Sequence, residues 1–435
     1  MVGNNSNAYS YYGVYINGDI TSTGKLTNAG SIIVTADNTS STAYAYGVYV
    51  NNNLNGSLVN SGTIAATAIG PTSAYAYGVY ISGDLNGSLT NSGTISATAV
   101  ADTSSASAYG AYVGGSLNGT LTNSGTIAAK TNVYSSSVGY AYGVYVGSDL
   151  AGSLVNTSTG TISAKAKNTD SYTPYAYGVY INSNLSGSLT NAGTISATAT
   201  GNTDSAYAYG VYVGSDLSGA LTNTGTISAN ATVTDSDTAY AYGVYANTIS
   251  GTLTNKGTIS ATATNLGDRF ATGAVSAYGI YTYDITGTGS IVNQGTILAT
   301  ADATNNTKSG NSAYAYGIYN QGSVAAGASI INSGTIQAIA NGSGKNGTTY
   351  GYASAYGITV RGSLNGVISN TGTISAAVNT VPFGGVYGTV YGVHVSGDVS
   401  ASGSIVNTGT ISAAANAYGT SYPYPPSWRD GEVIC

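Results

Sequence analysis

The strongest constraint on the fold is a tandem repeat that fills almost the whole chain. The dipeptide Tyr-Gly marks twelve equivalent positions at intervals of 31 to 40 residues, and the pattern Asn-x-Gly-Thr-Ile, or a close variant of it, follows each of these twelve copies. Leu or Ile stands two residues before each of these asparagines. Repetition at this period is typical of solenoid proteins, in which one unit cannot bury its apolar face alone and stacked units share a core.

Within each repeat, apolar residues recur with a period of two, as expected for strands with one buried face. Ile95 and Ala97 alternate with Thr and Ser, Val79 precedes an outward tyrosine, and Leu89 shares a side with Asn91. The abundant Val, Ile, Thr and Tyr also favour strands. We therefore predict an all-β fold in which residues 1–416 form one parallel β-solenoid domain of about twelve coils.

Twelve asparagines occupy one equivalent place in the twelve repeats. In a solenoid, each residue faces its counterparts in the coils above and below at strand spacing. A side-chain amide both donates and accepts hydrogen bonds, so a column of asparagines can bond along its length. We interpret the set as a structural ladder, with a ligand or glycan role as the alternative. Its members are Asn28, Asn60, Asn91, Asn123, Asn156, Asn191, Asn223, Asn255, Asn293, Asn332, Asn370 and Asn407.

Two sets of tyrosines flank the repeated glycine. One tyrosine precedes the glycine in all twelve units, and another follows two residues after it in ten units, with Thr359 and His394 in the last two. Positions three apart lie on opposite faces of a regular strand, so we expect the first set in or at the edge of the core and the second as an exposed stripe. Stacking stabilises both sets, and the stripe can also be a sticky surface for sugars, host molecules or a copy of the chain. The expected stripe contains Tyr15, Tyr49, Tyr80, Tyr112, Tyr145, Tyr180, Tyr212, Tyr245, Tyr281 and Tyr319.

Charged residues make up only 6% of the chain, against roughly 25% in ordinary domains. A charge kept at one position would form a column of like charges, which is destabilising at strand spacing. Ten Lys and Arg residues in a chain of net charge −6 are too few for a nucleic-acid surface. The sequence therefore predicts no nucleic-acid partner.

Groups for catalysis are equally sparse. The abundant Ser and Thr have no base beside them, and the only histidine, His394, replaces a stripe tyrosine and is interpreted as a surface substitution. A carbohydrate-active enzyme would need a pair of carboxylates that the repeats lack. We predict a protein that is not an enzyme, with no cofactor and no metal site.

Aspartate recurs before an apolar residue in six repeats. A carboxylate column can bind Ca²⁺, but the other six units carry other residues there and the calcium nonapeptide Gly-Gly-x-Gly-x-Asp is missing. We interpret these aspartates as turn caps, and weak Ca²⁺ binding stays open. The outer Thr-x-Ser-x-Thr face is similar to ice-binding surfaces, but Lys130, Lys165, Leu298 and Gln337 interrupt it. The six aspartates are Asp19, Asp84, Asp149, Asp216, Asp284 and Asp398.

The two ends differ from the repeats. Residues 417–435 form a non-repeat, Pro-rich C-terminal tail with the only tryptophan, Trp428, and the only cysteine, Cys435. We interpret the tail as a linker or an interaction segment, and Cys435 as a free thiol. The start has no features of a signal peptide, and no apolar run is long enough for a transmembrane helix. The expectation is a piece of a longer protein.

The tandem arrangement of Asn-x-Gly-Thr-Ile, Ser-Ala-Thr-Ala and Tyr-Gly-Val-Tyr resembles the passenger regions of bacterial autotransporter adhesins and related filamentous-haemagglutinin-like surface proteins, over roughly residues 9–416. The resemblance implies a right-handed parallel β-helix, an extracellular location, and attachment to the outer membrane in the full-length parent. It also implies adhesion to glycans or proteins of host or neighbouring cells, or self-association.

Two functional hypotheses follow. The first is a non-enzymatic surface rod, an adhesin passenger fragment whose Tyr-lined and Thr/Ser-lined faces mediate adhesion or self-association. The second is a filament subunit that stacks end to end, because open solenoid ends expose unpaired strands.

Overall fold

The computed structural model describes residues 9–134, 138–170, 172–202, 204–234, 238–267, 273–304, 312–342, 351–380 and 386–417. The chain divides into two compact units, one made of Met1–Asn202 with Tyr207–Ile227 and the other of Thr203–Ala206 with Ser228–Cys435. Throughout the described ranges the regular structure is β-strand, without a helix, and strands follow one another in sets of three. The prediction of an all-β parallel solenoid is confirmed.

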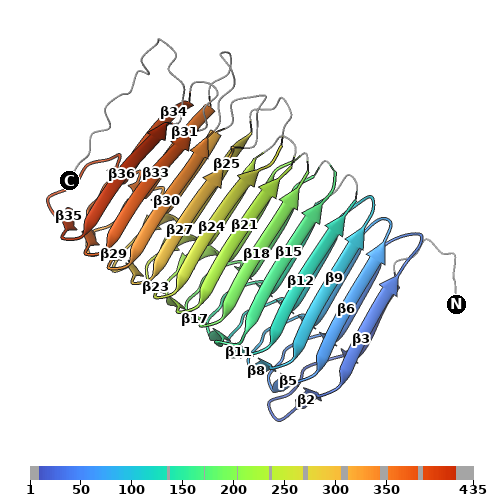
Figure 1. Cartoon of the computed structure of the whole chain (residues 1–435). Helices are drawn as coiled ribbons and strands as arrows, with labels where there is room; N and C mark the ends of the chain where they lie inside the picture. Colours follow the sequence, from blue (N-terminus) through green and yellow to red (C-terminus); the bar gives the residue numbers. More distant parts are fainter. Residues whose placement is uncertain are drawn as a thin grey trace. The chain divides into compact units, whose positions relative to one another are not determined.

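In the first unit each coil contributes one strand to each of three parallel sheets (Figure 1). The first sheet contains, in spatial order, β1 (Tyr9–Ile16), β4 (Ala43–Val50), β7 (Ala74–Ile81), β10 (Ala106–Val113), β13 (Gly139–Val146), β16 (Pro174–Ile181) and β19 (Ala206–Leu217). The second contains β2 (Lys25–Asn28), β5 (Ser57–Asn60), β8 (Ser88–Asn91), β11 (Thr120–Asn123), β14 (Ser153–Asn156), β17 (Ser188–Asn191) and β20 (Ala220–Asn223). The third contains β3 (Ser31–Asp37), β6 (Thr63–Gly70), β9 (Thr94–Ala101), β12 (Thr126–Val133), β15 (Thr161–Asn168) and β18 (Thr194–Gly201).

The second unit repeats this plan, and β21 (Thr226–Val233) contains the division between the units. Its first sheet contains β22 (Ala239–Ile249), β25 (Ala274–Ile285), β28 (Ser312–Asn320), β31 (Gly351–Val360) and β34 (Val386–Val395). Its second contains β23 (Thr252–Asn255), β26 (Ser290–Asn293), β29 (Ser329–Asn332), β32 (Val367–Asn370) and β35 (Ser404–Asn407). Its third contains β24 (Thr258–Asn265), β27 (Thr296–Asp302), β30 (Thr335–Gly342), β33 (Thr373–Thr380) and β36 (Thr410–Ala417).

Neighbouring coils pair in register, so equivalent residues of the repeat lie directly above one another. Asn91 pairs with Asn123 in the second sheet, and Ile95 pairs with Ile127 in the third. Register in a parallel sheet is strongly specified where one face is buried, because a slip of one residue would turn the apolar set outward. The repeat therefore converts a sequence pattern into vertical files of identical side chains.

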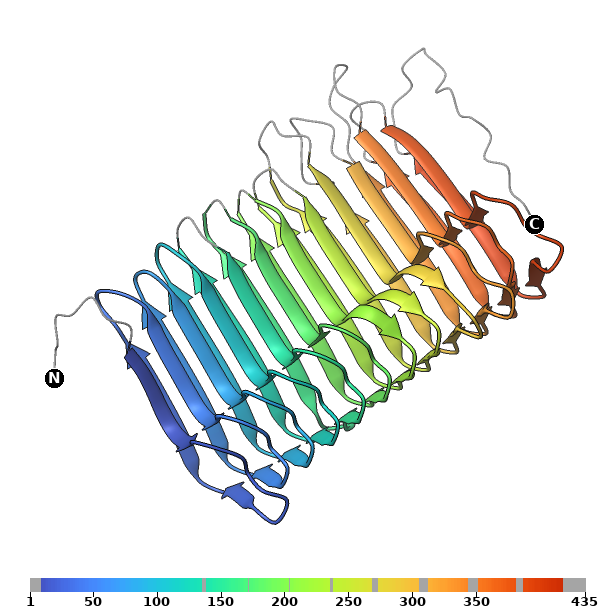
Figure 2. The ribbon, with the colours of Figure 1, turned by 180° about the vertical axis from the view of Figure 1, so that it is seen from behind.

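The core of each unit lies between the first and third sheets, with the second sheet along one side (Figure 2). Ile95 and Ala97 of the third sheet, Val79 of the first and Leu89 of the second are all buried, as their periodicity predicts. Alanine dominates the inward face of the third sheet because the opposing wall is close. The segment between the first and second strands adds a further file, in which Leu85 pairs in parallel with its counterparts in the adjacent coils.

The glycine of each Tyr-Gly pair lies where two backbones and the opposite sheet meet. A Cβ added to Gly78 would lie 2.6 Å from Cγ2 of Ile95 and 2.6 Å from the carbonyl oxygen of Gly110. Neither approach is compatible with a side chain, so glycine is required for packing. Gly78 and the adjacent Val79 are both buried, so the in–out alternation of β7 shifts by one residue at this point.

The predicted C-terminal tail is almost entirely outside the described residues. Strand β36 ends at Ala417, and residues 418–435, with Trp428 and Cys435, are not described. The predicted boundary at residue 416 and the predicted role of the tail stay predictions.

Candidate functional surfaces

The predicted asparagines form hydrogen-bonded ladders inside both units. In the first unit, each Nδ2 donates to the Oδ1 of the next asparagine at 2.8 Å, from Asn28 through to Asn223. In the second unit the same bonds run from Asn255 to Asn407 at 2.7–2.8 Å. The members between the ends are essentially inaccessible to solvent, so these side chains hold the coils together and present nothing to a ligand.

Ladder asparagines that have a following coil also tie their own turn to it. Nδ2 of Asn91 donates to the carbonyl oxygen of Gly93 at 3.2 Å and to that of Thr126 at 3.0 Å, in addition to Asn123. A buried amide that satisfies several backbone acceptors is stabilising, and its loss leaves those groups without partners. The ladder is therefore a structural device at the corner between the second and third strands.

The two sets of tyrosines lie on the same outer face of the first sheet, so the prediction of opposite faces was wrong. The reason is the shift of alternation at the glycine, which places Tyr77 and Tyr80 on one side of β7. Their ring centroids are 5.0 Å apart in an edge-to-face arrangement. The set that precedes the glycine therefore lies outside the apolar core, although Tyr142 and Tyr177 are only 9% and 8% exposed because neighbouring rings cover them.

Along each file, the rings stack face to face. Centroid separations are 4.8–5.4 Å in the file that precedes the glycine and 4.7–5.3 Å in the file that follows it. The predicted stripe is therefore mostly half-buried: Tyr15 at the first coil is 49% exposed and Tyr319 only 9%. Stacked rings cover one another's faces, so the surface presents ring edges and hydroxyl groups to solvent.

A third file of tyrosines, which the sequence analysis did not single out, lies on the same face. It includes Tyr44 and Tyr75, with centroids 4.9 Å apart, and Tyr140 and Tyr175, 5.2 Å apart. Ser107 occupies this position in β10, in register between Tyr75 and Tyr140. The signal was the alternating Tyr-Ala-Tyr that precedes the glycine in seven of the twelve repeats, in which both tyrosines flank an inward alanine. We call the three files together the tyrosine face.

Burial raises the pKa of several phenols of the tyrosine face. Desolvation, followed by the charge of neighbouring tyrosines, raises the pKa of Tyr112, Tyr180 and Tyr281 to about 12. The same causes raise the pKa of Tyr77 and Tyr142 further. The hydroxyl of Tyr49 donates to Oδ1 of Asn51 at 3.1 Å. At neutral pH the face is therefore an uncharged array of hydrogen-bonding groups on an aromatic base.

Four of the recurrent aspartates accept hydrogen bonds from backbone amides of the following coil, which agrees with their interpretation as caps. Oδ1 of Asp84 accepts from the amide of Ser116 at 2.7 Å, and Oδ1 of Asp19 accepts from the amide of Asn53 at 2.9 Å. Oδ1 of Asn53 in turn accepts from the amide of Asp84 at 2.8 Å. Asp and a neutral residue alternate at this position through the first unit, so carboxylates do not lie in adjacent coils, and Asn53 and Asn184 make the same capping bond.

Neither a catalytic group nor a metal cluster stands out in the described part of the chain. His394 packs against Tyr391 with ring centroids 4.7 Å apart, and its Nδ1 has no hydrogen-bond partner. Burial, together with the charge of Arg361, lowers its pKa. Among the described residues, no three His, Cys, Asp or Glu side chains are grouped as metal ligands would be. In that same part of the chain, no helix is long and apolar enough to cross a membrane.

No protein-family model, curated protein or solved structure matches this chain.

Proposed function

We propose that the chain is a non-enzymatic scaffold, part of an extracellular rod of the adhesin-passenger kind on a bacterial cell surface. One observation carries the proposal: every outward position is repeated in register from coil to coil. A weak contact made by one coil is therefore offered again at intervals of about 4.8 Å. Repetition of this kind converts weak single contacts into strong multivalent attachment.

The tyrosine face is the first candidate for that attachment. Its hydroxyl groups and ring edges suit polar, uncharged partners such as surface glycans, or the tyrosine face of another copy. Stacking within the files leaves few free ring faces for a sugar to pack on. Recognition through this face would therefore depend on hydrogen bonds from the phenols.

Adhesion is tested with beads that carry the purified chain, applied to a glycan array and to beads that carry the same chain. The variant Y140S/Y175S removes two adjacent rings of the third file, at a position where Ser107 occurs naturally. We expect the wild-type beads to be retained and the variant beads to be retained less, with unchanged circular dichroism. Failure of wild-type beads to bind glycans or one another contradicts adhesion.

A second candidate, end-to-end assembly, has support from the polarity of the ladder. Asn28 donates to Asn60, whereas among the described residues nothing donates to its Oδ1. In the last described coil of the second unit, Nδ2 of Asn407 donates, among the described residues, only to its own turn, at Gly409. A further coil, from the same polypeptide or from a second copy, would complete both groups. Sedimentation across a dilution series separates the candidates, because a mass that stays monomeric at all concentrations contradicts the filament.

A further inference from the structure

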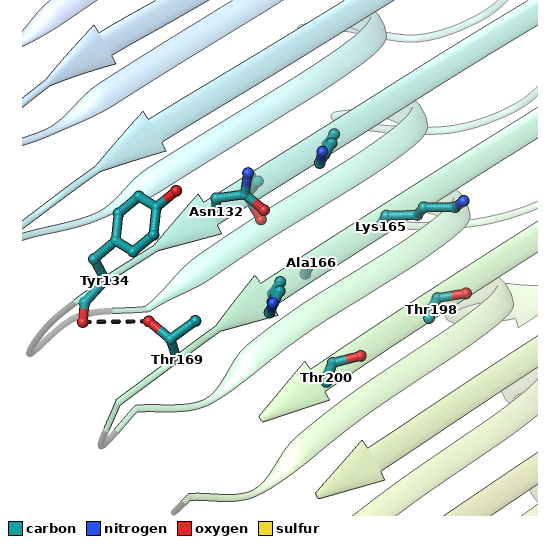
Figure 3. A pocket seen from close by; sticks show the side chains of 10 residues that line it. Asn132, Tyr134, Lys165, Ala166, Thr169, Thr198 and Thr200 are labelled. Atoms are coloured by element: carbon teal, nitrogen blue, oxygen red, sulfur yellow. Dashed lines mark hydrogen bonds between the residues drawn. The ribbon is translucent and has the colours of Figure 1, made fainter. Parts of the chain in front are cut away.

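A shallow groove of about 320 Å³ lies on the outer face of the third sheet in the first unit. Figure 3 shows its side chains on adjacent strands β12, β15 and β18, with Lys165 and Thr198 on neighbouring coils. Its lining includes Lys130, Asn132, Lys165, Lys167, Thr198 and Thr200. The groove thus collects three of the ten Lys and Arg residues in the chain.

The register brings these lysines together. Lys130 pairs directly with Lys165 across neighbouring strands, so their backbones are about 4.8 Å apart. Lys167 lies two residues beyond Lys165 on the same outer face, about 7 Å along the strand. Thr198 and Thr200 continue both rows in the next coil and offer hydroxyl groups.

This cluster breaks the rule that the rest of the unit follows. At the capping position, Asp and neutral residues alternate so that carboxylates do not meet in adjacent coils. Here two lysines face each other directly, which is destabilising, and none of the three lysines forms an ion pair with a described residue. The three ammonium groups are exposed, so an anion from solution can reach them.

We propose that this groove binds clustered sulfate or phosphate esters carried on a soluble saccharide or polyol. The ammonium groups would bind the ester oxygens, and Asn132, Thr198 and Thr200 would hydrogen-bond the polyol. Three cations in a groove of this size suit a ligand of one or two sugar units and are too few to track a nucleic-acid backbone. The proposal rests on the proposed function in one respect, because it names a ligand class for the Thr/Ser-lined face.

The test is isothermal titration of the full chain with sucrose octasulfate and with inositol hexakisphosphate, and with sucrose as the uncharged control. We expect saturable binding of both polyanions, weaker at higher salt, and no binding of sucrose. Lys165→Gln should weaken binding about tenfold or more, since it removes one charge-assisted contact. Lys256→Gln makes the same change of net charge in the other unit, at a turn, and should leave the affinity unchanged.

Three results would overturn the proposal: no binding of either polyanion by the wild type, equal affinity of Lys165→Gln and wild type, or an equal loss in Lys256→Gln. Binding to phosphatidylglycerol vesicles without binding of the soluble probes would also overturn it. Thermal melts give a second readout, because a bound ligand stabilises the folded chain, and the polyanions should raise the melting temperature of the wild type more than that of Lys165→Gln. A negative result here leaves bead adhesion through the tyrosine face unaffected, so the two failures are distinguishable.

Discussion

Truncation of one ladder asparagine should destabilise the chain far more than its size suggests. Asn123 is fully buried, accepts from Nδ2 of Asn91 at 2.8 Å and donates to Oδ1 of Asn156 at 2.8 Å. It also donates to the carbonyl oxygens of Gly125 and Thr161, both at 3.1 Å. Asn123→Ala removes all four bonds at once.

The cost comes mainly from the partners that are left behind. Nδ2 of Asn91 keeps its two backbone acceptors, but Oδ1 of Asn156 loses the ladder bond inside the protein. Each buried polar group without a partner costs about 1–3 kcal/mol, and the lost bonds to the carbonyls and the small cavity add to this. We expect Asn123→Ala to lower the free energy of unfolding by about 3–5 kcal/mol.

The matched control is Asn86→Ala. Asn86 also bonds from coil to coil, to Asn55 at 2.8 Å and from Asn118 at 2.9 Å, but it is exposed. Its loss should cost about 0.5 kcal/mol or less. Guanidinium unfolding followed by far-ultraviolet circular dichroism compares the two variants, and hydrogen exchange of peptides from residues 88–133 locates the loss. Equal stability of the two variants would refute the reasoning.

Three further predictions concern charge, packing and ionisation. Asn53→Asp puts three carboxylates in adjacent coils and should lower the free energy of unfolding by about 1–2 kcal/mol at pH 7. Because neighbouring like charges raise the pKa of the introduced carboxyl in the folded state, this loss should vanish below about pH 4. Thermal melts across the pH range would show it. Gly143→Ala would place a Cβ 2.5 Å from a carbonyl oxygen and 2.6 Å from an isoleucine methyl, so we expect the free energy of unfolding to fall by at least about 3 kcal/mol. The control is Gly30→Ala, where the added Cβ would lie in open space, and it should change stability by under about 0.5 kcal/mol. Similar denaturation midpoints for the two variants would contradict this account. The pKa of Tyr112 and Tyr180 is raised to about 12 in the folded chain, from about 10 in the unfolded chain. Their neutral, buried rings therefore contribute their full stabilisation below pH 10, and this contribution is lost as pH rises through about 12. Absorbance at 295 nm should show late ionisation accompanied by unfolding, and ionisation near pH 10 with the fold intact would argue against burial of the rings.

The repeat was sufficient to predict the fold and the ladder. A period of two predicts which residues face inward only if the strand is regular, and this held for Ile95, Leu89 and Asn91. Equivalent positions in successive repeats meet in register because one face of every strand is buried. The ladder follows from register and from the chemistry of the amide alone.

The arrangement of the tyrosines could not be obtained in the same way. It depends on Gly78, whose close approach to Ile95 is a tertiary contact and turns two consecutive residues inward. The groove was also beyond sequence reasoning, because Lys130 and Lys165 are 35 positions apart in the numbering and meet only through the pairing of β12 with β15. In the sequence alone, both lysines stand out only as interruptions of a threonine array.

The most direct test of the central claim is the distance between spin labels on residues that share one file. Lys25, Ser57 and Ala220 belong to a single file in the second sheet of the first unit, with Ala220 six coils from Lys25 and five from Ser57. In a Cys435→Ser background, electron double resonance should give about 29 Å for labels at positions 25 and 220 and about 24 Å for labels at 57 and 220, a step of about 4.8 Å per coil. Broad distributions, or two distances that do not differ by one strand spacing, would contradict the stacked solenoid.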